Sequence, residues 1–339
     1  MGGEPVANVT VYFATNRVPQ GATTDWQSYR ADIIPPTDPS QIIYAEAFVE
    51  GTDLTVEGSG TITAISHPQT GGFETGVAQD IVGSGKNILV FIHGFANSFL
   101  NSIARAAYNR EWFAAPGANA ADTTVIAFSW PSLGQLFAAP PHLLPDDYLR
   151  DQSKAGQSAF HIASFFTNLQ PMLTQVRNQG RRVFLLAHSM GNFALAGAVE
   201  SWFSHGNPTV TLFDEVFLPA ADERWDSFTL PMGVRLSRLP ALTPRISIYY
   251  SVRDIALYLS VSVNFIPRMG HEGPIHKTDA ALYPPARFRI LDCAEVSDYD
   301  LWNPPDASHQ YYRRSPKVRA DIVAAMRNDP NLPGGLIQL

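Results

Sequence analysis

A serine between small residues ends an apolar run in the middle of the chain. The run 183–186 leads into Ala187-His188-Ser189-Met190-Gly191, and a helical pattern follows. A buried strand that turns sharply through a serine into a helix is the sequence form of a nucleophile elbow, which strains the serine backbone and lifts its hydroxyl above the sheet. Ser189 is therefore the candidate nucleophile. Gly191 and His188 are expected to support the elbow, with His188 lining it or packing beneath it.

A serine hydroxyl is a weak nucleophile until a base accepts its proton, so a histidine and an orienting carboxylate are required. Behind a nucleophile elbow these residues follow in the order serine, acid, histidine. His309 lies in a polar segment after the last apolar run, and we interpret it as the base. Asp254 follows the strand-like run 246–250 and is the preferred acid. Asp222, after an earlier apolar run, is the alternative acid.

Attack on a carbonyl creates an oxyanion, which needs two hydrogen-bond donors. One donor is expected to be the backbone N–H of Met190, the residue after the nucleophile. The other is expected to be the N–H of Phe95, because the strand-like run 88–93 ends in His93-Gly94 and the glycine lets the backbone turn toward the site. His93 and Gly94 are thus expected to support the pocket.

The elements that must position these residues alternate between short apolar runs and helical patterns from Ile88 onward. Such an alternation is typical of a parallel sheet covered on both faces. Before it, β-branched residues alternate over 44–49 and 54–65, which predicts an antiparallel edge hairpin. The predicted fold is therefore α/β, a doubly wound and mostly parallel sheet with N-terminal antiparallel edge strands. Other expected strands are 9–14, 88–93, 125–130, 183–188, 212–218, 246–250 and 288–291, and expected helices are 98–112, 148–176, 190–203 and 316–327.

The length of 339 residues suits one large domain with an N-terminal extension. We expect a single domain over 1–339, in which 1–85 form the extension and the edge strands. The segment 131–146 is rich in Pro, Leu and Phe and is too long for an ordinary connection, so it is predicted to be a small cap insertion.

Composition excludes several classes of function. A formal net charge of −7 argues against nucleic acid or an anionic membrane surface as partner, since both require a clustered positive field. No apolar stretch is long enough for a transmembrane segment. The nine histidines show no His-x-x-x-His ligand pair, and no metal or other cofactor is expected. The single cysteine, Cys293, lies in a strand-like run where a buried packing role is expected.

The N-terminal residues 1–5 lack the basic and apolar regions of a secretion signal. As written, the sequence fits a cytoplasmic protein, and it equally fits an exported protein whose signal has been removed. The sequence does not determine the oligomeric state.

Several further segments accompany the elbow. In combination they resemble the α/β-hydrolase superfamily, and within it a bacterial serine-hydrolase group catalogued as DUF900. One departure is Ala187, where the common elbow Gly-x-Ser-x-Gly has its first glycine; alanine is a mild change at this crowded position. The resemblance implies that the aspartate at 222 recurs in the family, which keeps Asp222 as a supporting residue or alternative acid. The similar segments are 11–17, 91–95, 128–131, 187–191, 221–222 with Phe228, 254–257 and 308–312.

These residues predict a cofactor-independent serine hydrolase that cleaves small-molecule carboxylic esters of short to medium acyl chain through an acyl-enzyme. Apolar residues in 133–144 and 263–266 could form an acyl pocket, or they could be ordinary cap packing. A thioesterase, an amidase or an acyltransferase would use the same residues. A non-catalytic binding protein on the same fold is the alternative from another class.

Overall fold

The computed structural model describes residues 7–56, 58–115, 121–133, 144–296 and 307–339. The chain forms two compact units, Met1–Val183 and Phe184–Leu339. Each unit contains half of the strand-and-helix series predicted above, and the single-domain organisation stays a prediction.

The first unit is built on five strands in the order β6-β7-β1-β4-β5. The parallel pairs β6·β7 and β7·β1 continue into the antiparallel pairs β1·β4 and β4·β5, which confirms the predicted edge hairpin. The second hairpin strand begins seven residues later than the predicted range 54–65, because Asp53 accepts the Thr55 N–H at 2.8 Å and holds that stretch in a turn. The strands are β1 (Ala7–Thr15), β4 (Ile43–Gly51), β5 (Thr61–Thr70), β6 (Asn87–Ile92) and β7 (Thr123–Ser129).

The remaining elements of the first unit include two helices where one was predicted. The expected helix 148–176 is wrong, since the chain bends at Ser158. The Ser158 hydroxyl donates to the Lys154 carbonyl at 2.8 Å, and such back-bonding bends helices. Of the predicted cap 131–146, residues 134–143 lie outside the described residues. The elements are α1 (Thr75–Gly83), α2 (Phe99–Ala114), α3 (Leu144–Gln157), α4 (Ala159–Asn178) and the short pair β2 (Arg17–Pro19) and β3 (Tyr29–Ile33).

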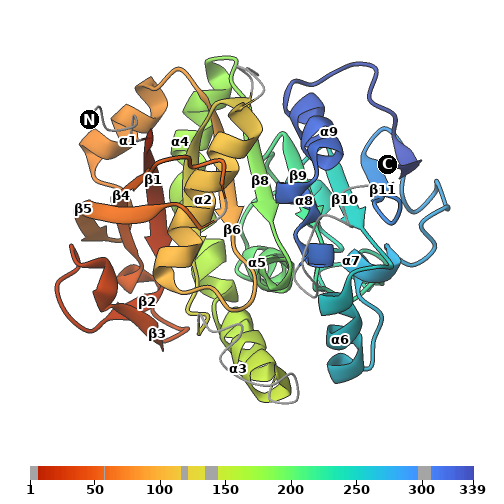
Figure 1. Cartoon of the computed structure of the whole chain (residues 1–339), viewed down its shortest axis with the longest axis horizontal. Helices are drawn as coiled ribbons and strands as arrows, with labels where there is room; N and C mark the ends of the chain where they lie inside the picture. Colours follow the sequence, from red (N-terminus) through yellow and green to blue (C-terminus); the bar gives the residue numbers. More distant parts are fainter. Residues whose placement is uncertain (1–6, 57, 116–120, 134–143, 297–306) are drawn as a thin grey trace. The chain divides into compact units, whose positions relative to one another are not determined.

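The second unit is built on five strands that lie side by side in the order β12-β11-β10-β9-β8 (Figure 1). Their described pairings are all parallel, and every residue of β8, β9 and β10 is buried, as expected for strands covered on both faces. The short last strand was not predicted. The strands are β8 (Val183–Ala187, which begins at the unit boundary), β9 (Glu215–Pro219), β10 (Ile246–Tyr250), β11 (Phe288–Asp292) and β12 (Gly335–Gln338).

Five helices accompany these strands, and the last one begins as predicted. Ser315 caps α9 by accepting the Val318 N–H, with Pro316 at the first helical position. Helix α7 contacts both β10 and α6. The helices are α5 (Met190–Ser204), α6 (Ile255–Asn264), α7 (Met269–Glu272), α8 (Tyr311–Arg314) and α9 (Pro316–Met326).

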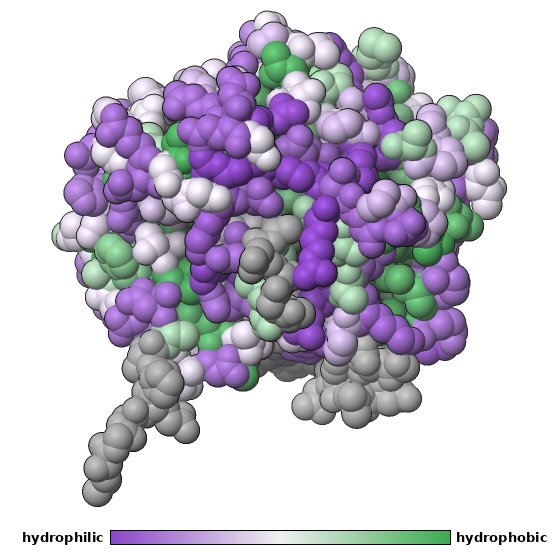
Figure 2. All heavy atoms as spheres, turned by 90° about the horizontal axis from the view of Figure 1, so that it is seen from above, coloured by the Kyte–Doolittle hydropathy of each residue, from purple (hydrophilic) through white to green (hydrophobic). Residues whose placement is uncertain are grey.

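Most of the buried side chains are apolar. Hydrophilic side chains predominate on the face shown in Figure 2, with hydrophobic ones scattered among them. Cys293 is buried just after β11, and this burial raises the pKa of its thiol well above the ordinary value. No helix among the described ranges is both long enough and apolar enough to cross a membrane.

Candidate active site

The second unit places three predicted residues beyond the carboxyl ends of its parallel strands. Ser189 follows β8, Asp254 follows β10, and His309 ends a short 3₁₀ turn (Ala307–His309) further along the chain than β11. The carboxyl ends of parallel strands lie at one edge of a sheet, where α/β proteins bind their ligands. The topology therefore brings together residues that are up to 120 positions apart in sequence.

Ser189 occupies the strained turn that the sequence predicted. Its backbone has φ 54° and ψ −126°, a conformation that costs a non-glycine residue of the order of 1–3 kcal/mol. Hydrogen bonds hold this turn: the Ser189 carbonyl accepts the N–H groups of Asn192 at 2.9 Å and Asp222 at 3.1 Å, and the Gly191 N–H donates to the His188 carbonyl at 2.8 Å. The strain is thus maintained by contacts on both sides of the elbow.

His309 lies between the serine and an aspartate. Its Nε2 is 2.8 Å from Ser189 Oγ, and its Nδ1 is 2.7 Å from Asp254 Oδ2. Because a carboxylate only accepts hydrogen bonds, Nδ1 carries the proton of the neutral ring, and the Nε2 lone pair faces the serine hydroxyl. The imidazole is therefore oriented to accept the hydroxyl proton.

Asp254 is fully buried and serves two partners with its two carboxylate oxygens. Oδ2 accepts from His309, and Oδ1 caps α6 by accepting the Leu257 N–H at 3.0 Å. The N–H of Ile255, the first residue of α6, donates to Ser308 Oγ at 3.0 Å. The start of α6 consequently holds both the acid and the segment that carries the histidine.

Asp222 has other partners in the second unit. Its carboxylate accepts the Ser260 hydroxyl at 2.6 Å and forms an ion pair with Arg268, whose Nε is 3.4 Å away. Its backbone N–H is the group that donates to the Ser189 carbonyl. The structure thus brings Asp254 to the histidine and places Asp222 behind the nucleophile.

His188 lies beside the histidine of the site. Its ring centroid is 4.9 Å from that of His309 and 4.6 Å from that of Tyr312. Its Nε2 is 3.4 Å from the His309 carbonyl oxygen. His188 therefore packs along the segment that carries the base.

The two backbone N–H groups predicted to bind the oxyanion belong to different units. Phe95 follows β6 in the first unit, and Met190 begins α5 in the second. Within the described ranges neither N–H donates a hydrogen bond to another protein group. The joint use of the two donors stays a prediction.

The loop after β6 is held by buried charged groups that the sequence analysis did not single out. Arg17 donates to the carbonyls of Asn97 at 2.9 Å and Trp130 at 2.7 Å. Asp151 accepts the N–H groups of Ala96 at 3.2 Å and Leu133 at 3.0 Å. Burial raises the pKa of Asp151, although these donors oppose the shift. Arg17 could have been found from the sequence, because it ends the segment 11–17 that is similar to the family. No sequence pattern pointed to Asp151.

His93 also stabilises the loop after β6. Its ring is stacked on Trp130 with centroids 4.9 Å apart, and the Trp130 indole N–H donates to the His93 carbonyl at 2.7 Å. Burial, reinforced by the positive charge of Arg17, lowers the pKa of His93 to about 3. The lowered pKa favours the neutral ring. The contacts of both ring nitrogens with carbonyl oxygens, Nδ1 with Gly94 at 2.9 Å and Nε2 with Trp130 at 3.1 Å, oppose this shift of the pKa.

This lowered pKa predicts a loss of stability in acid. Between pH 6.5 and about 3 the unfolded chain binds a proton that native His93 refuses, so the stability contribution is complete above pH 6.5 and declines as the pH falls. The expected slope is about 1.4 kcal/mol per pH unit in the free energy of unfolding. Urea unfolding of His93→Gln across this range should lack that slope. His67→Gln, which removes an exposed histidine, should keep it.

A bound metal has no obvious ligands here. Within the described ranges, no three His, Cys, Asp or Glu side chains are grouped as a metal site requires.

A ten-strand pattern of mostly parallel strands and interspersed helices, with a serine on a strained strand-to-helix turn, defines an α/β-hydrolase. More particularly, the chain belongs to the family of α/β-hydrolases of unknown function called DUF900, whose model matches residues 70–327. No curated protein matches the chain significantly. The predicted fold and family are thus confirmed, and the chain is a hydrolase of some kind.

Proposed function

We propose that the protein is a serine hydrolase that cleaves carboxylic esters of short to medium acyl chain through an acyl-enzyme. The single observation that carries this proposal is the unbroken hydrogen-bonded chain from Ser189 Oγ through the His309 ring to Asp254. A serine hydroxyl becomes a nucleophile when an adjacent base accepts its proton, and in this arrangement the aspartate orients and stabilises that base.

In the proposed reaction His309 removes the Ser189 proton as the hydroxyl oxygen attacks the ester carbonyl. Asp254 stabilises the imidazolium that forms and keeps the ring oriented. The N–H groups of Met190 and Phe95 bind the oxyanion. The imidazolium then protonates the leaving alcohol, and water, activated by the same histidine, releases the acid from the acyl-serine.

The outer surface of α6 supports an uncharged, apolar acyl group as the substrate. This helix starts at the acid, and residues 255–266 include no charged side chain. Apolar side chains on it are open to solvent, with Tyr258 64% and Phe265 89% exposed. Exposed apolar surface beside a site is typical of ligand-binding regions. The predicted pocket residues 263–266 lie at the end of this helix.

Two measurements test the proposal. A fluorophosphonate probe should modify the purified protein, and mass spectrometry should locate the adduct on Ser189. Hydrolysis of p-nitrophenyl esters of increasing acyl length should then show a maximum at short to medium chains. Absence of any adduct would support the binding-protein alternative, whereas labelling without ester hydrolysis would redirect the search to thioesters, amides or acyl transfer.

A further inference from the structure

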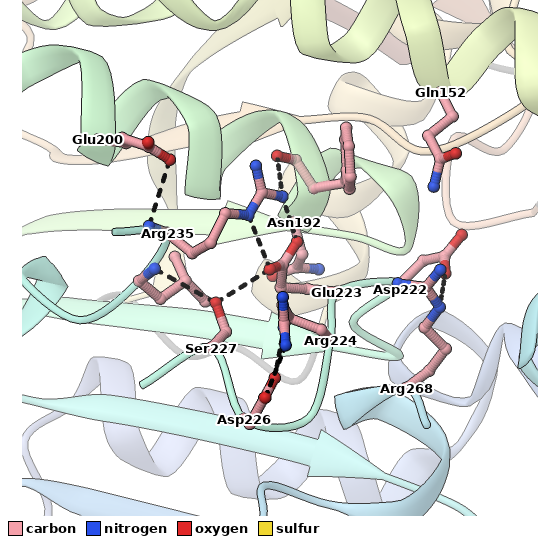
Figure 3. A network of polar contacts seen from close by, with 12 residues as sticks. Gln152, Asn192, Glu200, Asp222, Glu223, Arg224, Asp226, Ser227, Arg235 and Arg268 are labelled. Atoms are coloured by element: carbon pink, nitrogen blue, oxygen red, sulfur yellow. Dashed lines mark hydrogen bonds and ion pairs between the residues drawn. The ribbon is translucent and has the colours of Figure 1, made fainter. Parts of the chain in front are cut away.

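Two adjacent carboxylates, Asp222 and Glu223, are buried after β9. Their residues are only 2% and 1% exposed. A buried charge is costly unless it is paired and hydrogen-bonded. Each carboxylate has its own arginine, Arg268 for Asp222 and Arg235 for Glu223, and the two pairs point away from one another (Figure 3). Two adjacent buried ion pairs are costly to form, which suggests a role for the two carboxylates besides filling the core.

Asp222 connects the nucleophile with the helix of the acid. Its backbone N–H donates to the Ser189 carbonyl at 3.1 Å, so it contacts the strained residue of the elbow directly. Its carboxylate accepts the hydroxyl of Ser260 at 2.6 Å. Ser260 lies on α6, the helix that Asp254 caps. One residue therefore links the backbone of the serine to the helix whose first turn holds the acid.

Glu223 fixes the helix that follows the nucleophile. Arg235 donates to its carboxylate through Nε at 3.0 Å and Nη2 at 2.5 Å, and Ser227 Oγ donates at 3.0 Å. The same Arg235 Nη2 donates to the Phe193 carbonyl on α5 at 3.2 Å, and the guanidinium lies 4.4 Å from the centre of the Phe193 ring. Glu223 thus holds the first turn of α5 through a bidentate arginine.

The backbone around the two carboxylates is too closely packed to shift easily. The Gly270 N–H donates to the Ala221 carbonyl at 2.8 Å, and the Ser251 N–H donates to the Gly270 carbonyl at 2.9 Å. A Cβ atom at Gly270 would lie 2.2 Å from the Ala221 nitrogen, so only glycine allows this approach. The turn after β9 and the turn after β10 are therefore joined through one glycine.

We propose that Asp222 and Glu223 are positioning residues, which set the distance between the nucleophile and the acid by holding Ser189 and α5 on one side and α6 on the other. This inference rests on the proposed serine hydrolase. The hydrogen bonds of 2.7 and 2.8 Å through His309 tolerate little displacement, and a shift of about 1 Å at a reacting group can cost about 100-fold in rate.

The rate of Ser189 phosphonylation by a fluorophosphonate, with kcat and KM on a p-nitrophenyl ester, tests the role of Asp222. Asp222→Ala should slow phosphonylation by about 10–100-fold and lower kcat by a similar factor, with KM changed less than about twofold. Ser260→Ala keeps the ion pair between Asp222 and Arg268. It removes the link to α6 and the weaker hydrogen bond from the Asn264 amide to Ser260 Oγ at 3.3 Å, so it should slow phosphonylation several-fold in a fully folded protein. Glu223→Gln should give an intermediate loss.

A rescue and a matched control separate positioning from general stability. The double variant Asp222→Asn with Arg268→Met removes both buried charges and keeps an acceptor for Ser260, so it should recover phosphonylation to within about threefold of the wild-type rate. Asp226→Asn changes a carboxylate in the same loop, whose described partner is Arg224, and should react at the wild-type rate. Thermal unfolding of each variant shows whether it is folded.

Wild-type rates in both Asp222→Ala and Ser260→Ala would overturn the positioning role and leave the proposed function intact. A loss in Asp222→Ala that the double variant does not rescue, combined with a wild-type rate in Ser260→Ala, would also overturn it. If the wild-type protein itself is not phosphonylated at Ser189, the proposed function fails, and this inference fails with it.

Discussion

Replacement of Ser189 by alanine is expected to lower kcat for ester hydrolysis by about 10⁶-fold, because the members of a catalytic triad act as a unit and lose most of their effect with the nucleophile. The hydroxyl oxygen is the atom that would form the acyl-enzyme, and it is the one that lies 2.8 Å from His309 Nε2. Initial-rate measurements on a p-nitrophenyl ester that the wild-type protein hydrolyses give the comparison. Substrate binding should change little, since only one oxygen atom is removed.

A serine elsewhere on the same helix provides the control for this variant. Ser204 ends α5 and is exposed, with a described hydrogen bond to the Ser201 carbonyl. Ser204→Ala should retain full activity and full labelling by the fluorophosphonate. Wild-type activity in Ser189→Ala, with both proteins folded, would rule out Ser189 as the nucleophile and with it the acyl-enzyme mechanism.

Replacement of Asp254 by asparagine is expected to lower kcat by about 10⁴-fold, the size of effect seen when a triad acid is made neutral without loss of shape. The amide can still cap α6, but its NH₂ group would face His309 Nδ1 and favour the tautomer with the proton on Nε2. That tautomer has no lone pair for the Ser189 proton. The pH dependence of kcat, followed together with the rate, should show the loss at every pH at which the wild type is active.

The comparison with Asp222 decides between the two aspartates. Asp222→Asn should lose far less activity than Asp254→Asn, because the structure places Asp254 and not Asp222 against His309 Nδ1 in its described contacts. An Asp222→Asn variant that loses about 10⁴-fold while Asp254→Asn stays active would reverse the assignment. Circular dichroism of both variants excludes loss of folding as the cause.

Periodicity and local signals were sufficient for most of the elements. Strand β10 at Ile246–Tyr250 has the predicted bounds, and α9 begins at the Ser315-Pro316 signal. These features depend on near neighbours in the chain, which the sequence displays directly. The bend at Ser158 was missed because it depends in part on Asn16, whose amide donates to the Ser158 hydroxyl from 142 residues away.

The sequence by itself determined the fold class and the family, and it singled out a serine and a histidine as the candidate nucleophile and base, because a nucleophile elbow and the order of elements are local or sequential properties. Only the tertiary structure decided which aspartate meets His309. Asp254 and Asp222 each follow a buried strand, but their carboxylates have different partners. Asp254, at the start of α6, contacts the His309 ring, whereas Asp222 contacts Ser260 and Arg268. Contacts between residues so far apart in the chain depend on how the strands are ordered and how closely their loops pack, and no pattern within a single segment encodes them.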